Sequence, residues 1–210
     1  MMDKTFLESL EFRHACKVFD ESKKIPQKDL EFILDAGRRA PSSFGMEAWK
    51  FLVITNEELK AKLRPLCWNQ VQITSCSHLV VVLAGIESVK VESGIPKKRF
   101  ARREMPQDKL DFYLNLYADH LKETLSSDEN IYAWTAKQTA FAAANMMSAA
   151  AVKGVDSCPI EGYDRDALEA LLELDKSKYR LSMLLPLGYR INEQSSQQRL
   201  SYDEVVEYID

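Results

Sequence analysis

The sequence lacks the glycine-rich signatures that hold nucleotides in the commonest folds. Its 210 residues contain no G-x-G-x-x-G motif and no P-loop lysine, which excludes a Rossmann or P-loop grip on a phosphate. It also lacks an apolar run long enough to span a bilayer, and its start, Met-Met-Asp-Lys, has no signal-peptide core. We therefore expect a cytoplasmic protein with no membrane partner.

Cysteine is scarce, and no linker or repeat interrupts the chain. The cysteines are widely spaced without metal-type pairing, so we expect free thiols and no metal site; they are Cys16, Cys67, Cys76 and Cys158. No stretch is rich in proline, glycine or serine, which predicts a single domain over residues 1–210. The formal net charge of −4 argues against nucleic acid as a partner.

Hydrophobic periodicity predicts an α+β fold with few strands. Residues 79–84 are nearly all apolar, the pattern of a strand covered on both faces. The region 86–105 is irregular, and the tail from 189 onward is polar until an amphipathic end at 205–209. The other expected strands are 49–55, 155–158 and 181–187, and the expected helices are 26–39, 57–66, 107–125, 131–153 and 165–174.

The expected helix 131–153 has an unusual composition. Residues 139–151 are apolar on nearly every side, so the helix has to be buried over most of its surface. One small domain offers little cover for it, which predicts a second subunit packed against this helix. The alternative is the central helix of a monomer.

Three possible cationic donors, Arg13, His14 and Lys17, lie within five residues of one another in the segment RHACKVFD, residues 13–20. In a chain of negative net charge, such a cluster predicts an anionic ligand. Arginine presents a planar fork that suits phosphate, and lysine presents a mobile point charge. The alternative is a solvated helix end.

Four further segments carry groups that suit the same ligand. PSSFG (41–45) offers hydroxyl and backbone N–H groups, and WNQVQ (68–72) offers side-chain amides. PIEGY (159–163) lets the backbone approach a flat ligand, and QQRL (197–200) adds an arginine. Each segment alone is also explained as a turn, a helix surface, a strand exit or a solvated tail.

Together these segments follow a known order: R-H-x-x-K-x-F-D, P-S-S, W-x-F, an Asn before S-H-x-V-V-V, P-I-E-G and R-L. This order resembles the FMN-dependent NAD(P)H nitroreductase family from about Phe6 to Leu200. The resemblance implies an α+β sandwich with a mainly antiparallel central sheet flanked by helices. It also implies a homodimer with FMN at the interface and a tail, about 189–210, packed on the partner subunit. The neighbourhood of Cys16 resembles an epsilonproteobacterial branch of that family.

The resemblance assigns roles to individual residues. Those it assigns to the phosphate end of the flavin are Arg13, His14, Ala15 and Arg199, with Ser42 and Ser43 reaching the ribityl chain and phosphate from the partner subunit. Those it assigns to the ring are Lys17, Asn69, Gln72, Gln138, Pro159, Ile160, Glu161 and Gly162. Tyr117 and Phe44 are assigned to the substrate pocket.

The reaction implied is ping-pong. NADH or NADPH delivers hydride to FMN and leaves, and a nitroaromatic or quinone-like acceptor then takes its place. The flavin supplies the chemistry, so no catalytic acid or nucleophile is expected. A thiol enzyme built on Cys16 and His14 is disfavoured, because residues so close on a turn seldom face each other. The alternatives are a flavin or enone reductase of the same fold, a non-catalytic flavin-binding protein, and a helical scaffold without cofactor.

The sequence departs from the family pattern at charged positions. Gln72 and Gln197 stand where other members have lysine, and Glu47-Ala48 stands where Gln-Pro is usual. Each change removes positive charge or adds negative charge near the expected flavin, which predicts a lower reduction potential. The basic run at 97–103 either meets the 2′-phosphate of NADPH or forms a solvated, mobile lid.

Overall fold

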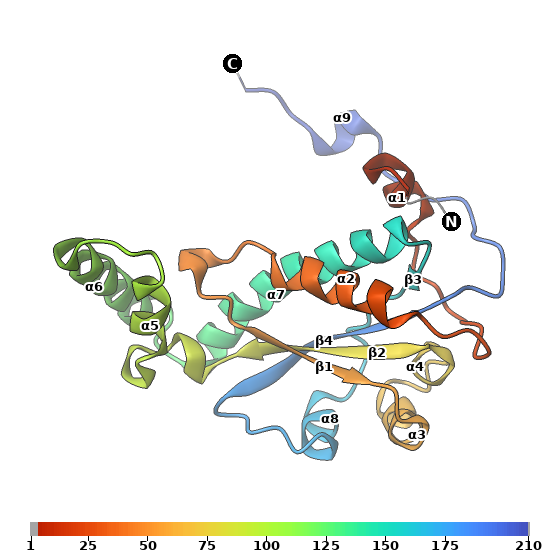
Figure 1. Ribbon diagram of the computed structural model, residues 1–210, viewed down its shortest axis with the longest axis horizontal. Helices are drawn as coiled ribbons and strands as arrows, with labels where there is room; N and C mark the ends of the chain where they lie inside the picture. The colour runs from red at the N-terminus through yellow and green to blue at the C-terminus, as the bar shows by residue number, and fades with distance from the viewer. Residues whose placement is uncertain (1–3, 210) are drawn as a thin grey trace.

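The computed structural model describes residues 4–209, and residues 1–3 and 210 of the expected domain lie outside that part. Figure 1 shows the arrangement of its helices and strands. The α-helices are α1 (Phe6–Phe12), α2 (Gln27–Arg38), α3 (Glu57–Leu66), α4 (Gln72–Ser75), α5 (Ile95–Ala101), α6 (Gln107–Thr124), α7 (Asp128–Val152), α8 (Arg165–Leu171) and α9 (Tyr202–Val205). The strands are β1 (Trp49–Ile54), β2 (His78–Gly85), β3 (Asp156–Ser157) and β4 (Tyr179–Gly188), and short 3-10 turns lie at Ser43–Gly45, Glu87–Val89 and Val91–Ser93.

The centre of the molecule is an antiparallel sheet with the strand order β1-β2-β4-β3. Alternate residues of β2 point to opposite faces: Val80 and Val82 pack with α2 and α7, whereas Leu79 and Val81 pack with α3, α4 and α8. Both faces of β2 are therefore covered, as its apolar run predicts. The expected α+β fold with an antiparallel sheet flanked by helices is confirmed.

Helices α2 and α7 lie against each other on one face of the sheet. Gly37 makes this close approach possible, because a Cβ atom there would lie 2.6 Å from Cγ of Met146. The contact fixes the direction of α2. The segments that contain the candidate site residues lie near the two ends of α2 (Figure 1).

The region 86–105 differs from the sequence expectation, because it contains α5 rather than irregular chain. Gly94 begins this helix in a left-handed conformation, and Pro96 occupies its first turn. Phe100 is fully buried against Tyr117. A single buried aromatic in a run of cations gives no helical period, which is why periodicity did not reveal the helix. Together α5 and α6 form a lobe at one end of the sheet (Figure 1).

The tail after β4 first returns toward α1 and then leaves the body of the molecule (Figure 1). Residues 190–197 contact α1, whereas the residues beyond them, α9 included, are mostly exposed. Leu200, Val205 and Ile209 are apolar and exposed in this last part. Within residues 4–209 no helix is both long and apolar enough to cross a membrane.

Candidate functional site

The segment around Arg13 runs beside β3 and the residues that follow it. Ala15 forms a parallel bridge with Ser157, and the Cys16 N–H donates to the Ser157 carbonyl at 3.1 Å. This pairing brings Lys17 to Cys158, whose Sγ lies 3.9 Å from the lysine Nζ. The amide nitrogen of Gln72 lies at the same distance from that sulfur. Three segments that are distant in sequence thus meet at Cys158.

The turn before α4 is fixed to the 159–162 segment. Gln70 donates its amide to the Gly162 carbonyl at 2.9 Å. Trp68 and Asn69 both have left-handed backbone, with φ of 53° and 55°, which is costly for residues with a side chain. This strained turn leaves Trp68 73% exposed, with its ring packed on Gly162, where a Cβ atom would lie 2.6 Å away. No sequence pattern assigns a role to Trp68, because backbone strain and exposure leave no signal in a sequence.

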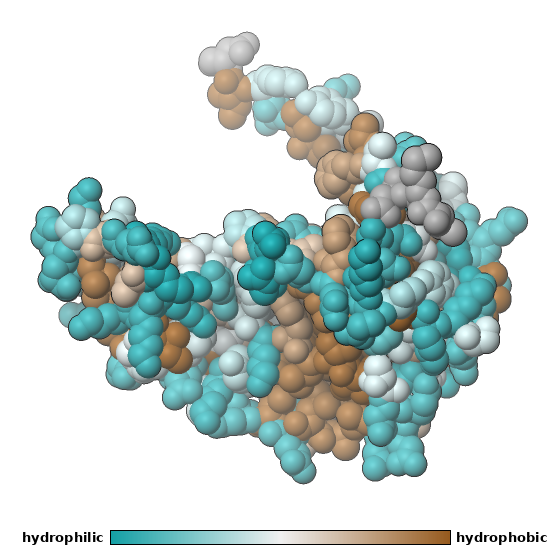
Figure 2. Space-filling model, in the orientation of Figure 1, coloured by the Kyte–Doolittle hydropathy of each residue, from teal (hydrophilic) through white to brown (hydrophobic). Residues whose placement is uncertain are grey.

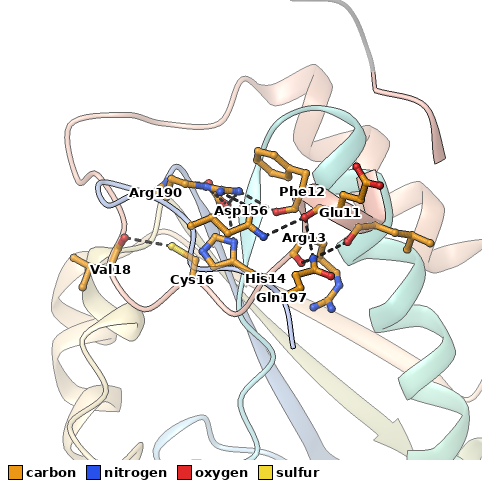
Figure 3. A network of polar contacts seen from close by, with 11 residues as sticks. Glu11, Phe12, Arg13, His14, Cys16, Val18, Asp156, Arg190 and Gln197 are labelled. Atoms are coloured by element: carbon orange, nitrogen blue, oxygen red, sulfur yellow. Dashed lines mark hydrogen bonds and ion pairs between the residues drawn. The ribbon is translucent and has the colours of Figure 1, made fainter. Parts of the chain in front are cut away.

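A buried ion pair between Asp156 and Arg190 lies next to His14 (Figure 3). The carboxylate of Asp156 accepts from the Arg190 backbone N–H at 2.9 Å and from its Nε at 2.7 Å. His14 lies beside the pair, with Nδ1 3.6 Å from Asp156. Burial and the Arg190 charge lower the pKa of His14, so its ring is neutral near pH 7. The pair was not predicted, because its members are 34 residues apart without a motif.

The pKa of His14 predicts how stability depends on pH. The unfolded chain regains the ordinary histidine pKa of about 6.5 and binds this proton first as the pH falls. The free energy of unfolding should therefore fall as the pH drops below about 6.5. In a His14→Gln variant the slope between about pH 5 and 7 should be shallower, as measured by urea unfolding at each pH. Equal slopes in the two proteins would contradict the assignment, and His78, whose pKa is also lowered by burial, should leave a residual slope.

The thiols near His14 are poor nucleophiles. Burial, followed by the Asp156 charge, raises the pKa of Cys16 to about 11, and its Sγ donates to the Val18 carbonyl at 3.3 Å. Burial also raises the pKa of Cys158. Both thiols are protonated at neutral pH, which agrees with the rejection of a thiol mechanism.

The groups around this segment suit an anionic ligand that accepts hydrogen bonds. Within residues 4–209, the side chains of Arg13 and Lys17 form no ion pair, and Nδ1 of His14 is a buried polar atom without a hydrogen bond. A pocket of about 210 Å³ lies between residues 14–18 and the start of the tail. Arg199 lies on the exposed tail, where its guanidinium donates to the Gln198 carbonyl. Cations without a carboxylate partner in the described part of the chain are the donors that a flavin phosphate requires. The amide of Gln72 already donates to Oε1 of Gln70 at 2.9 Å, and Glu193 also lines the pocket.

The P-S-S segment forms a second cluster elsewhere. The Ser43 N–H donates to Oε1 of Gln138 at 2.8 Å, and Ser42 Oγ accepts from the Glu47 N–H at 2.8 Å. Gln138 is thus committed to the turn that holds the serines. Phe44 lies on Tyr117 with ring centroids 5.1 Å apart. Tyr117 itself is fully buried and donates to the Val89 carbonyl at 2.6 Å, so it can shape a substrate pocket only through Phe44.

The two arginines that follow α5 hold this turn, which changes one expectation. Arg102 donates to both carboxylate oxygens of Glu47 at 3.2 Å, and Arg103 donates to the Phe44 carbonyl at 2.9 Å. The charge of Glu47 is therefore offset by Arg102, rather than adding free negative charge to the site. The basic run at 97–103 comprises the end of α5, with Phe100 buried, and the two arginines that follow it; its role as a lid or as a site for the 2′-phosphate of NADPH stays a prediction.

The two clusters lie at opposite ends of α2 (Figure 1). The first, near residues 13–17, precedes the start of α2, and the second, near residues 42–44, follows its end. A helix of 12 residues is about 18 Å long. One copy of the chain therefore does not gather all the predicted residues around one ligand.

A model of the nitroreductase family matches residues 10–189. A relative in Bacillus subtilis, YfkO, provisionally named an NAD(P)H nitroreductase, is 38% identical over 97% of this chain and 96% of its own. The chain belongs to the nitroreductase family. The expected family is thereby confirmed, whereas its epsilonproteobacterial branch stays a prediction.

Solved structures of the family share the fold. A provisionally named nitroreductase of Exiguobacterium sibiricum, in complex with FMN, superimposes with a TM-score of 0.85 at 25% identity, covering 100% of this chain and 99% of that one. CLA-ER, a gut-bacterial enone reductase of fatty-acid saturation, superimposes with a TM-score of 0.84 at 19% identity over the full length of both chains. The second likeness shows the fold alone. It also shows that this fold serves more than one acceptor.

Proposed function

We propose that the protein is an FMN-dependent NAD(P)H oxidoreductase that reduces nitroaromatic or quinone-like acceptors. The observation that carries the proposal is the approach of Lys17 and Gln72 to Cys158, which directly precedes the 159–162 segment, in a chain of the nitroreductase family. When bound, FMN supplies hydride chemistry between NADH or NADPH and the acceptor. The chain supplies binding, orientation and charge.

Arg13 and Arg199 bind the flavin phosphate in this proposal. Lys17 and Gln72 donate to the polar edge of the ring, and Asn69 completes that edge. The backbone of residues 159–162 packs along the ring, with the Trp68 side chain fixed beside Gly162. His14, neutral at pH 7, adds no charge of its own and accepts or donates a hydrogen bond near the phosphate.

We propose further that the protein works as a homodimer, because the second cluster must reach the flavin from a partner subunit. One face of α7 supports this: Ala133, Lys137, Ala140, Phe141 and Ala144 recur at helical spacing and are exposed in the single chain. Phe141 is 54% exposed. A face of mostly small, apolar residues on a central helix, with Lys137 as its one charged member, fits a second copy better than solvent.

The outer edge of β1 is the place we propose for the partner's tail. β1 is an edge strand, and beside it lies a shallow groove of about 640 Å³ whose apolar residues include Leu34, Trp49, Phe51 and Val53. Figure 2 shows hydrophobic surface over β1 and along the tail. An open, apolar edge strand needs cover, and the apolar end of a partner's tail, around Val205 and Ile209, would supply it.

An absorption spectrum of the purified protein, before and after anaerobic addition of NADPH or NADH, tests the proposal. Flavin bands that bleach on addition, and return when a nitroaromatic or quinone is added, are the expected result. Bands that stay oxidised with both donors would favour a non-catalytic flavin-binding protein. A colourless protein that takes up no FMN would contradict the site.

The departure at Gln72 yields a prediction for the redox potential. A lysine here would place a positive charge where the reduced flavin gains negative charge, so Gln72→Lys should raise the midpoint potential. A preference of about 1.4 kcal/mol for the reduced form corresponds to about 30 mV for two electrons. Potentiometric titration measures the shift, with the exposed Gln198→Lys variant as control. An unchanged or lower potential would show that Gln72 does not face the ring.

A further inference from the structure

The C-terminal end of α1 is closed by side chains of the tail. The last carbonyls of a helix have no partner within it and need one from elsewhere. Here the carbonyls of four consecutive residues at the end of α1 accept from three tail side chains. Gln197 Nε2 lies 2.9 Å from Leu10 O, 2.9 Å from Glu11 O and 2.7 Å from Arg13 O, Gln194 Nε2 lies 3.1 Å from Glu11 O, and Arg190 lies 3.1 Å from Phe12 O.

This cap matters because α1, which packs on α7, is a short helix. The helix has seven residues, too few for stability on its own, and its apolar side chains Phe6, Leu7 and Leu10 are exposed. Its beginning is fixed by a capping box between Thr5 and Glu8. Its end is tied to the tail, more than 170 residues away in sequence.

Arg13 is the residue that this cap positions. It follows α1 directly, and its N–H donates to the Ser9 carbonyl while its own carbonyl accepts from Gln197. Both peptide groups of Arg13 are thus held, which leaves the guanidinium as its free end (Figure 3). On the other side of the cap, Arg190 is fixed by Asp156 of β3, so the cap is tied to the sheet.

We infer that Gln197, with Gln194 and Arg190, is a positioning residue that holds Arg13 where the flavin phosphate binds. The inference rests on the proposed function. Gln197 thus serves as a helix cap built from the tail.

The test is a double-mutant cycle on FMN binding by the full-length apoprotein, read by quenching of FMN fluorescence. Gln197→Met keeps the length of the side chain and removes its donors, and it should weaken FMN binding about 10-fold. Gln198→Met, whose side chain makes one 3.4 Å contact with Ser196, is the matched control and should change nothing. In an Arg13→Ala background, Gln197→Met should change the dissociation constant by less than about twofold, because the residue it positions is gone.

Additive effects in this cycle would overturn the inference, since they would make Gln197 a direct ligand. Hydrogen exchange of a peptide spanning residues 6–17, measured without FMN, is a second readout: exchange should rise in Gln197→Met and stay unchanged in Gln198→Met. Equal exchange in both variants would overturn the cap. Failure of the wild-type chain to bind FMN would overturn the proposed function, and the exchange result would still decide the cap. If Gln197→Met does not fold, as judged by circular dichroism, Gln194→Met takes its place. It removes the bond to the Glu11 carbonyl and the bond accepted from Arg190, and should give a loss in the same direction.

Discussion

Asp156→Ala should lower the free energy of unfolding by about 3–5 kcal/mol. The carboxylate is 4% exposed and accepts two hydrogen bonds from Arg190, so its removal leaves a guanidinium half enclosed without its partner. Urea unfolding of the apoprotein measures the loss. Asp166→Ala is the control, because its ion pair with Lys176 lies on the surface and should be worth less than about 1 kcal/mol.

Asp156→Ala also separates two roles of the Asp156–Arg190 pair, which are to stabilise the fold and to hold the end of α1. Arg190 also donates to the Phe12 carbonyl, so an unpaired Arg190 should loosen the end of α1 as well as the fold. Asp156→Asn keeps the shape and an acceptor, and should lose less stability than Asp156→Ala. A loss below about 1 kcal/mol for Asp156→Ala would show that water replaces the carboxylate, and that the pair lies closer to solvent than its burial indicates.

Local signals account for the elements that the sequence predicts well. The predicted helix 57–66 is α3 to the residue, because Asn56 caps it and its first turn is acidic. The apolar run 79–84 lies within β2, since burial on both faces leaves no room for polar residues. Helix α1 was not predicted, although Thr5 and Glu8 form a capping box at its start. Its residues Phe6, Leu7 and Leu10 are exposed, so this helix shows no periodic apolar face turned toward the core.

The candidate site likewise contains residues that sequence motifs reveal and residues that only tertiary contacts place. Arg13, Lys17 and the 159–162 segment lie in motifs whose order alone indicates a flavin protein. Tertiary contacts decide the rest: Glu47 is neutralised by Arg102, which lies 55 residues away and carries no pattern that pairs the two. Charge counted along a sequence cannot show which charges are already paired. The prediction of a lower flavin potential therefore now rests on Gln72 alone, since Gln197 serves α1.

Arg13→Ala should weaken FMN binding about 10- to 100-fold. The guanidinium makes no ion pair with the described part of the chain, so it is available for a charge-assisted bond to phosphate, worth about 1.5–3 kcal/mol. Stability should change little, because the backbone of Arg13, rather than its side chain, joins the cap at the end of α1. Titration of the apoprotein with FMN measures the affinity, and urea unfolding checks the fold.

The control is Lys178→Ala, which removes one positive charge next to Asp175 on the surface at the far end of β4. It should leave FMN affinity unchanged, so that a loss seen only in Arg13→Ala reports a local contact rather than net charge. Riboflavin, which lacks the phosphate, sharpens the test: the Arg13→Ala variant and the wild-type chain should bind it equally. If the two differ for riboflavin as much as for FMN, Arg13 acts on the ring or on the fold, and the phosphate site must be sought around Arg199 instead.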